Sequence, residues 1–122
     1  MNEKTVFIAA YGTLRSGERN ARFCKRPVSR REAAAVGTLY DTTYGFPAFV
    51  PEGNTLVTVE LIEIPISDWA DVDRLEVYPR LYDRKLLDFE LPDGEIIPAW
   101  IYIMNELPSQ AKVIPSGDWK NR

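Results

Sequence analysis

The chain lacks histidine entirely and holds a single cysteine, Cys24, among its 122 residues. Without histidine, the Ser-His-Asp and Cys-His catalytic mechanisms and most zinc sites are excluded. A single cysteine permits neither an intrachain disulfide nor a metal site built from a cysteine cluster. We therefore expect Cys24 to be a small packed or half-exposed residue. Any proton transfer must use carboxylates, lysine or tyrosine.

Long apolar runs are also missing. No stretch of about 18 apolar residues occurs, so we expect no transmembrane helix and no membrane partner. Residues 1–4 lack the basic-then-apolar pattern of a secretion signal, and a cytoplasmic location is the default expectation. The length predicts a single domain spanning residues 1–122. A content of 45% hydrophobic residues is enough for one core.

Acidic and basic residues are unevenly distributed, although the net charge is only −3. Residues 52–106 contain thirteen acids and four basic residues, whereas residues 15–31 contain a single acid, Glu18. Such a basic stripe can bind nucleic acid or an anionic ligand, but Phe23 is its only aromatic residue for base stacking. We therefore expect a solvated, charged connecting segment and treat nucleic-acid binding as the weaker alternative. The basic residues are Arg15, Arg19, Arg22, Lys25, Arg26, Arg30 and Arg31.

Short β-branched and aromatic runs, separated by nine prolines and seven glycines, predict a β-rich domain. Gly37 indicates a bulge or a close approach of two backbones. The shift of phase at Leu61 and Ile62 indicates a bulge or a strand end. A short helix is predicted within 17–26, and a second one runs from the N-cap Ser67 to Glu76. The predicted strands are 5–11, 33–40, 48–50, 56–64, 82–91 and 99–104.

This order of elements lacks the regular alternation of strands and helices found in doubly wound sheets. It predicts an α+β fold in which mixed strands form a small, closed or partly closed β-barrel with flanking short helices. The tail at 107–122 is expected to be irregular, with Trp119 as its anchor.

The first candidate site follows the predicted strand at 5–11. Here Tyr11, Gly12, Thr13, Leu14 and Arg15 form a turn in which consecutive backbone N–H groups can bind a carboxylate. Gly12 allows a ligand to approach the backbone closely. The segment is not a Walker loop, because the second glycine and the lysine are missing. From spacing alone, an ordinary strand-to-loop turn stays the alternative interpretation.

The second candidate is Glu76, which shares one face of the predicted helix with Trp69 and Val72. Because that face should point into the core, desolvation should raise the pKa of the Glu76 carboxyl. A raised pKa is what a general base working near neutrality requires. The alternative, which the residues alone favour, is a structural Glu76 paired with Arg80 or Arg84, and such a pair would lower its pKa.

Two further segments carry polar groups that could serve a site. Tyr78 and Tyr82 can line a pocket, and Arg84 can bind a carboxylate through two hydrogen bonds. Aromatic residues at such positions are also commonly part of a core. Residues 114–119 predict a turn with a buried tryptophan.

Together these segments resemble the γ-glutamylcyclotransferase-like family, especially its short bacterial and plant AIG2-like branch. The motifs follow the family's order along nearly the whole chain, and five in register are specific although each is weak alone. They are Val6-Phe7 with Tyr11-Gly12-Thr13-Leu14-Arg15, Phe46-Pro47-Ala48, Leu75-Glu76-Val77-Tyr78-Pro79 with Tyr82 and Arg84, Ala99-Trp100-Ile101-Tyr102, and Ile114-Pro115-Ser116-Gly117-Asp118-Trp119.

The resemblance implies a small barrel of mixed strands with a central cavity. It implies that backbone N–H groups of the loop from Tyr11 to Leu14 bind the α-carboxylate end of a γ-glutamyl substrate, and that Glu76 is the catalytic carboxylate. The implied reaction is cyclisation of a γ-glutamyl amide to 5-oxoproline and a free amine, without a metal or organic cofactor. The further substrate-binding candidates are Arg15, Tyr82 and Arg84.

The sequence departs from the family's pattern at Val77, where the family often has glycine after the glutamate. A β-branched residue there can narrow the cavity mouth or change the backbone, which affects substrate size more than chemistry. Two other functions stay open. One is a module that binds a small anionic metabolite in the same cavity without turnover. The other is docking of nucleic acid or an acidic partner at residues 15–31. The sequence indicates neither the amine side of the substrate nor the oligomeric state.

Overall fold

The computed structural model describes residues 4–18, 20–21, 24 and 27–122. Arg19, Arg22, Phe23, Lys25 and Arg26 of the basic segment lie outside the described residues, together with part of the short helix predicted within 17–26. The elements are β1 (Thr5–Ala10), β2 (Ser29–Asp41), β3 (Pro47–Pro65), a 3₁₀ turn (Ile66–Asp68), α1 (Trp69–Leu75), β4 (Tyr82–Glu90), β5 (Ile96–Met104), β6 (Lys112–Val113) and a second 3₁₀ turn (Trp119–Asn121).

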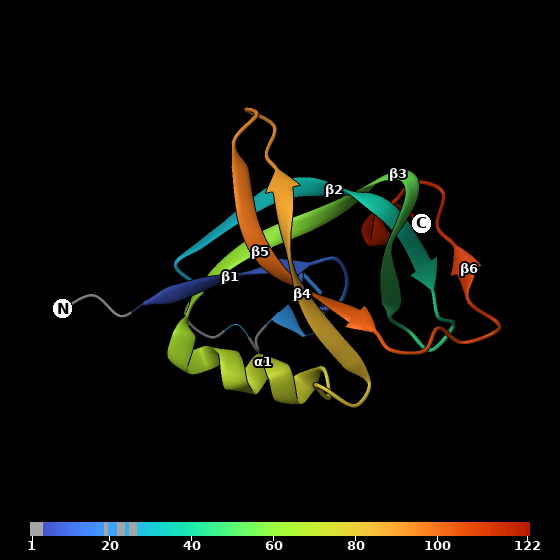
Figure 1. The fold of residues 1–122 in the computed structure, drawn as a ribbon, viewed down its shortest axis with the longest axis horizontal. Coiled ribbons are helices and arrows are strands. Elements are labelled where there is room, and N and C mark those ends of the chain that lie inside the picture. Colours follow the sequence, from blue (N-terminus) through green and yellow to red (C-terminus); the bar gives the residue numbers. More distant parts are fainter. Residues whose placement is uncertain (1–3, 19, 22–23, 25–26) are drawn as a thin grey trace.

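Within these residues, five strands close into a mixed β-barrel (Figure 1). They follow one another in the order β3, β1, β5, β4 and β2, and pairing of β2 with β3 closes the ring. The β1–β5 pair is parallel and the other pairs are antiparallel. The short strand β6 adds to the end of β2 at Tyr40 and Asp41. The predicted small barrel of mixed strands is therefore confirmed.

The longest ladder joins β2 to β3 and contains the irregularity predicted at Gly37. Gly37 pairs with Thr55, whereas the next residue, Thr38, pairs with Val50, so residues 51–54 stand outside the ladder. A Cβ atom on Gly37 would lie 2.7 Å from the ring of Phe49, which explains why only glycine fits there. The two strands predicted at 48–50 and 56–64 are thus parts of one strand, β3.

The bulge or strand end predicted at Leu61 and Ile62 is wrong. The β1–β3 ladder runs through both positions without a shift, since Ala9 pairs with Leu61 and Ile8 with Ile62. Both side chains are fully buried, Leu61 in the cluster inside the barrel and Ile62 in a second cluster that contains Val72 of α1. Two adjacent apolar residues occur here because both faces of the strand are covered.

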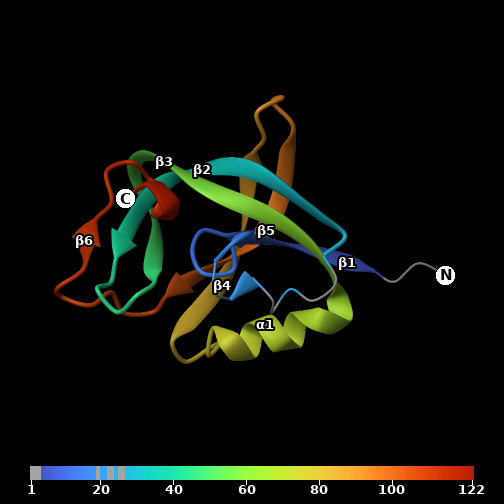
Figure 2. The same ribbon diagram turned by 180° about the vertical axis from the view of Figure 1, so that it is seen from behind.

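The central helix is shorter than predicted. α1 begins at Trp69 after the 3₁₀ turn, and Asp68 rather than Ser67 occupies the N-cap position, without a side-chain capping bond. α1 packs outside the barrel, below β1 and β4 (Figure 2). Among the described residues, no helix has the length and apolar character needed to cross a membrane. Glu76 is the residue immediately after α1, where the chain turns back toward β4.

Candidate active site

A cavity of about 120 Å³ opens where the end of β1, the end of α1 and the start of β4 meet. Six residues predicted from the sequence line it, namely Tyr11, Gly12, Thr13, Leu14, Glu76 and Tyr82. The structure therefore brings the backbone loop and the carboxylate together, as the sequence analysis expected. Other lining residues were not predicted as site residues, and they are Ala9, Ala10, Asn20, Phe46, Pro47, Leu75, Leu81 and Tyr102.

Residues 11–15 are here called the β1 loop, and residues 11–14 of this loop line the cavity. A Cβ atom on Gly12 would lie 2.6 Å from two ring carbons of Pro47, so the loop can pass Pro47 only with glycine at this position. The loop turns back at once, because the Arg15 N–H donates to the Gly12 carbonyl at 3.1 Å. Within the described residues, the N–H groups of Gly12, Thr13 and Leu14 have no hydrogen-bond acceptor. These are the groups that an anionic ligand would need.

Asn20 supports the β1 loop from the segment that follows it. Its backbone N–H donates to the Thr13 carbonyl and its side-chain amide donates to the Thr13 hydroxyl, both at 2.9 Å. Sequence reasoning missed Asn20 because it lies in a polar, charged stretch where a single amide is unremarkable. The seven-residue spacing between Thr13 and Asn20 is the sequence signal that could have indicated a hydrogen-bonded turn here.

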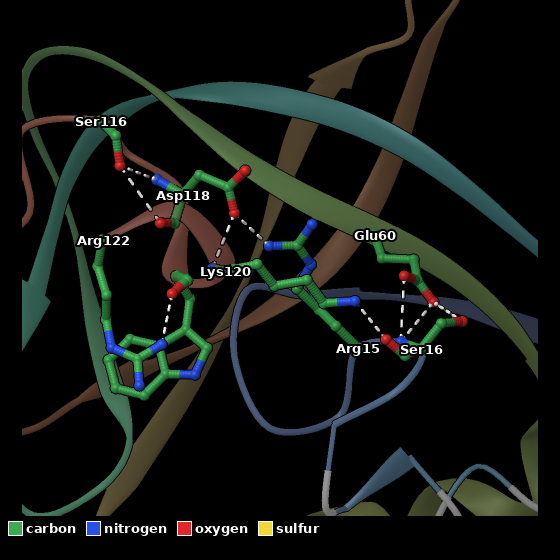
Figure 3. A network of polar contacts seen from close by, with 8 residues as sticks. Arg15, Ser16, Glu60, Ser116, Asp118, Lys120 and Arg122 are labelled. Carbon is green, nitrogen blue, oxygen red and sulfur yellow. Dashed lines mark hydrogen bonds and ion pairs between the residues drawn. The ribbon is translucent and has the colours of Figure 1, made fainter.

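Arg15 belongs to the β1 loop but does not line the cavity, and its role in substrate binding stays a prediction. Its guanidinium contacts the Asp118 carboxylate at 2.7 Å, as Figure 3 shows. Next to it, the Ser16 carbonyl accepts a hydrogen bond from Lys120, and the Ser16 N–H and hydroxyl bond to Glu60. Arg15 therefore joins the loop to the C-terminal turn.

Glu76 lines the same cavity from the end of α1. Its N–H still donates to the Val72 carbonyl at 3.0 Å, so the helix holds its backbone. Desolvation by the surrounding protein raises the pKa of the carboxyl to about 7. Within the described residues, Glu76 makes no ion pair: neither Arg80 nor Arg84 contacts it. The ion pair with Arg80 or Arg84 that the sequence left open is therefore not seen among the described residues, and a catalytic role of Glu76 stays a prediction.

Three tyrosines, Tyr11, Tyr82 and Tyr102, line the cavity together with Glu76. The Tyr11 hydroxyl donates to the carbonyl of Tyr102 at 2.6 Å. Burial, and secondarily the charge of Glu76, raises the pKa of Tyr82, and the same two causes contribute to the raised pKa of Tyr11. Both hydroxyls therefore stay protonated near neutrality, which leaves Glu76 as the group in the cavity able to exchange a proton there.

Val77 does not line the cavity, and its side chain is 45% exposed. Its effect is on the backbone: it adopts a φ of 52°, in the left-handed region that favours glycine. Arg84 does not line the cavity either; it pairs with Asp73 at 2.8 Å, and its role in substrate binding stays a prediction. Within the described residues, no group of three or more carboxylate or thiol side chains could hold a metal ion.

Comparison with known proteins agrees with this arrangement. The family model for γ-glutamyl cyclotransferase, AIG2-like proteins matches residues 8–121. A Vibrio cholerae protein, provisionally named as a γ-glutamylcyclotransferase, is 35% identical over 119 residues, which cover 96% of this chain and 96% of the relative. The γ-L-glutamyl-butirosin B γ-glutamyl cyclotransferase of Niallia circulans is 33% identical over 105 residues, which cover 80% of this chain and 66% of the relative.

Among solved structures, YkqA from Bacillus subtilis superposes with a TM-score of 0.75 and 26% identity, covering 97% of this chain and 40% of that one. The chain thus spans just under two thirds of the N. circulans relative and less than half of YkqA. The family match nevertheless extends over nearly the whole chain, from β1 to the C-terminal turn. The chain belongs to the γ-glutamyl cyclotransferase, AIG2-like family.

Proposed function

We propose that this protein converts a γ-glutamyl amide to 5-oxoproline and a free amine. The observation that carries the proposal is that Glu76 and the β1 loop line one cavity. The loop offers unused N–H donors for a carboxylate, and Glu76 offers a carboxyl whose pKa of about 7 lets it both accept and donate a proton.

The reaction can be written with the protein's own groups. The substrate's α-amine attacks its own γ-carbonyl carbon, a ring C–N bond forms, and the Glu76 carboxylate accepts the proton that the amine loses. The tetrahedral intermediate then collapses, the bond to the leaving nitrogen breaks, and Glu76 returns the proton to that nitrogen. Glu76 ends in its starting state, so the cycle needs no external acid or base.

Binding geometry supplies a further part of the rate. Because the nucleophile and the electrophile belong to the same substrate, the β1 loop contributes by holding the glutamyl carboxylate so that the chain folds back on itself. Gly12 and Thr13 line the same cavity as Glu76, which supports this role. Positioned acid–base catalysis by one carboxyl typically contributes a factor of about 10² to 10⁴.

The test is release of 5-oxoproline from a panel of γ-glutamyl amides, with Glu76→Gln beside the wild type. The proposal expects product from the wild type and a loss of turnover, with binding retained, in the variant. The panel should include γ-glutamyl-lysine, γ-glutamyl dipeptides and glutathione, since these share the recognised end. Saturable binding without product from any of them would instead assign the cavity to a binding module.

A further inference from the structure

Arg84 stands at the centre of a cluster outside the cavity. Its Nη1 donates to both carboxylate oxygens of Asp73, at 2.8 and 3.0 Å. Its Cζ lies 3.8 Å from the ring centroid of Trp69 and 4.4 Å from that of Tyr78, within the range of cation–π attraction. The pair is partly buried, with 20% of the Arg84 side chain and 22% of the Asp73 side chain exposed. We call these four residues and Tyr102 the Arg84 cage.

The Arg84 cage holds both ends of the turn that carries Glu76. Asp73 lies one helical turn before Glu76 and Tyr78 lies two residues after it. Arg84 contacts the side chains of both, and the Tyr78 N–H donates to the Asp73 carbonyl at 2.9 Å. Glu76 therefore lies in a short loop whose two ends are held by one guanidinium. That loop also contains Val77 in its unfavourable left-handed conformation.

Tyr102 connects the same cage to the β1 loop. Its hydroxyl donates to Asp73 Oδ1 at 2.5 Å and accepts a hydrogen bond from Trp69 Nε1 at 3.2 Å. Its backbone carbonyl accepts the Tyr11 hydroxyl, at the start of the β1 loop. Tyr102 also lines the cavity. A continuous set of contacts thus runs from Arg84 through Asp73 and Tyr102 to the loop that lines the cavity with Glu76.

We propose that Arg84 and Asp73 are positioning residues that clamp the Asp73–Tyr78 turn and so hold the Glu76 carboxyl in the cavity, away from bulk water. Neither residue touches the cavity, so each acts through the backbone and through Tyr102. Arginine suits this role better than lysine, because its planar guanidinium can pair with a carboxylate and stack on aromatic rings at the same time. The inference rests on the proposed role of Glu76 for its effect on turnover, but its structural part stands apart from that role.

The experiment compares Arg84→Gln and Asp73→Asn by NMR titration of the Glu76 carboxyl, which needs no substrate. If the two residues acted through their charge alone, loss of the Arg84 cation would raise the pKa of Glu76 and loss of the Asp73 anion would lower this pKa. If they act by positioning the turn, both variants loosen the turn and admit water, and both lower the pKa of Glu76. The titratable groups that Glu76 influences, Tyr11, Tyr82 and Cys24, and the cavity residue Tyr102 are not substituted in either variant.

The expected result is a downward shift in both variants, from about 7 in the wild type toward the ordinary carboxyl value. For 5-oxoproline release, kcat should fall about tenfold or more while KM changes little, because neither substitution removes the Tyr102 carbonyl that accepts the hydrogen bond from Tyr11 of the β1 loop. Arg84→Lys, which keeps the charge but loses the planar group, should show the same behaviour and serves if Arg84→Gln does not fold. Arg31→Gln, at an exposed pair with Glu95, is the matched control and should resemble the wild type.

Opposite shifts in the two charge-removing variants, or no shift in either folded variant, would overturn the proposal. Failure of the proposed function is a separate result. If the wild type releases no 5-oxoproline from any substrate, the cyclotransferase assignment fails, yet the Glu76 titration still decides whether Arg84 and Asp73 position this carboxyl.

Discussion

The guanidinium of Arg15 contacts the carboxylate of Asp118 at 2.7 Å, although the two residues are 103 positions apart. Only 7% of the Arg15 side chain is exposed, and among the described residues its Nε has no hydrogen-bond partner. Asp118 therefore supplies the main compensation for a buried positive charge. Because Arg15 ends the β1 loop, the C-terminal turn helps to hold the wall of the cavity in place (Figure 3).

Asp118→Asn should lower the free energy of unfolding at pH 7 by about 1–3 kcal/mol, because it leaves the Arg15 charge buried without its counterion. Burial acts to raise the pKa of Asp118, but the hydrogen bond from Arg15 outweighs burial and holds this pKa below its ordinary value. The stabilisation is thus present above the unfolded-state pKa and is lost as pH falls through the folded-state pKa. Denaturant unfolding from pH 7 to pH 3 measures both effects.

The matched control is Glu95→Gln, which removes one partner of the exposed Arg31–Glu95 pair. Exposed pairs contribute at most about 1 kcal/mol, so this variant should change stability little. Equal losses in the two variants would mean that burial of Arg15 does not matter.

Local patterns predicted the parts of the site that depend on local geometry. The strand running into Gly12 indicated the loop, and the spacing of Val72 and Glu76 placed the carboxylate toward the packed side. The bulge at Gly37 was also predictable, since glycine within a strand marks a place where side chains do not fit. These features follow from periodicity and from the absence of a Cβ atom.

The ion pairs that join distant parts of the chain were not predictable. Arg15 and Arg84 were predicted to bind substrate, and the structure pairs them with Asp118 and Asp73. No local pattern states which of several carboxylates an arginine will meet. Tyr102 was likewise missed as a cavity residue, because its role depends on contacts with β1 and α1, which lie far from it in the chain.

Glu76→Gln should stabilise the fold near pH 8 while abolishing turnover. Desolvation raises the pKa of Glu76 to about 7, so the folded state binds a proton that the unfolded state releases near pH 4.5. The free energy of unfolding of the wild type therefore falls as pH rises from 4.5 to about 7, and above pH 7 the protein bears the full cost of burying a charged carboxylate. Glutamine removes that cost, which is on the order of 1–3 kcal/mol.

Thermal unfolding of both proteins between pH 4 and pH 8 tests this relationship. The two stabilities should be similar at the acid end and diverge as pH increases. For the wild type, kcat/KM should decrease as pH falls below about 7, because the base form of Glu76 is required. If the stabilities of the wild type and of Glu76→Gln changed with pH in parallel, the charged Glu76 would cost the folded state nothing, and the prediction would be wrong.

Gly12→Ala should weaken substrate binding more than it weakens the fold. The added Cβ would lie 2.6 Å from the ring carbons of Pro47, and neither the ring nor the loop can move without displacing the N–H groups of the β1 loop. We expect KM to rise about tenfold or more. Gly94→Ala in the β4–β5 turn meets no atom within 4 Å and should leave KM unchanged. An unchanged KM in Gly12→Ala would remove the loop from the binding site.

Val77→Gly should raise the free energy of unfolding by about 1 kcal/mol, because the left-handed conformation disfavours β-branched residues by more than the extra chain entropy of glycine costs. Val77 has a φ of 52° and is 45% exposed, so little packing is lost with its side chain. Its N–H and carbonyl bonds to Arg74 and Leu81 do not depend on the side chain. Val36→Gly, on the exposed face of β2, is the opposite control and should destabilise the protein, since glycine weakens a strand. Chemical denaturation decides the matter: equal destabilisation in both variants would show that Val77 is unstrained and that the turn carrying Glu76 does not need glycine.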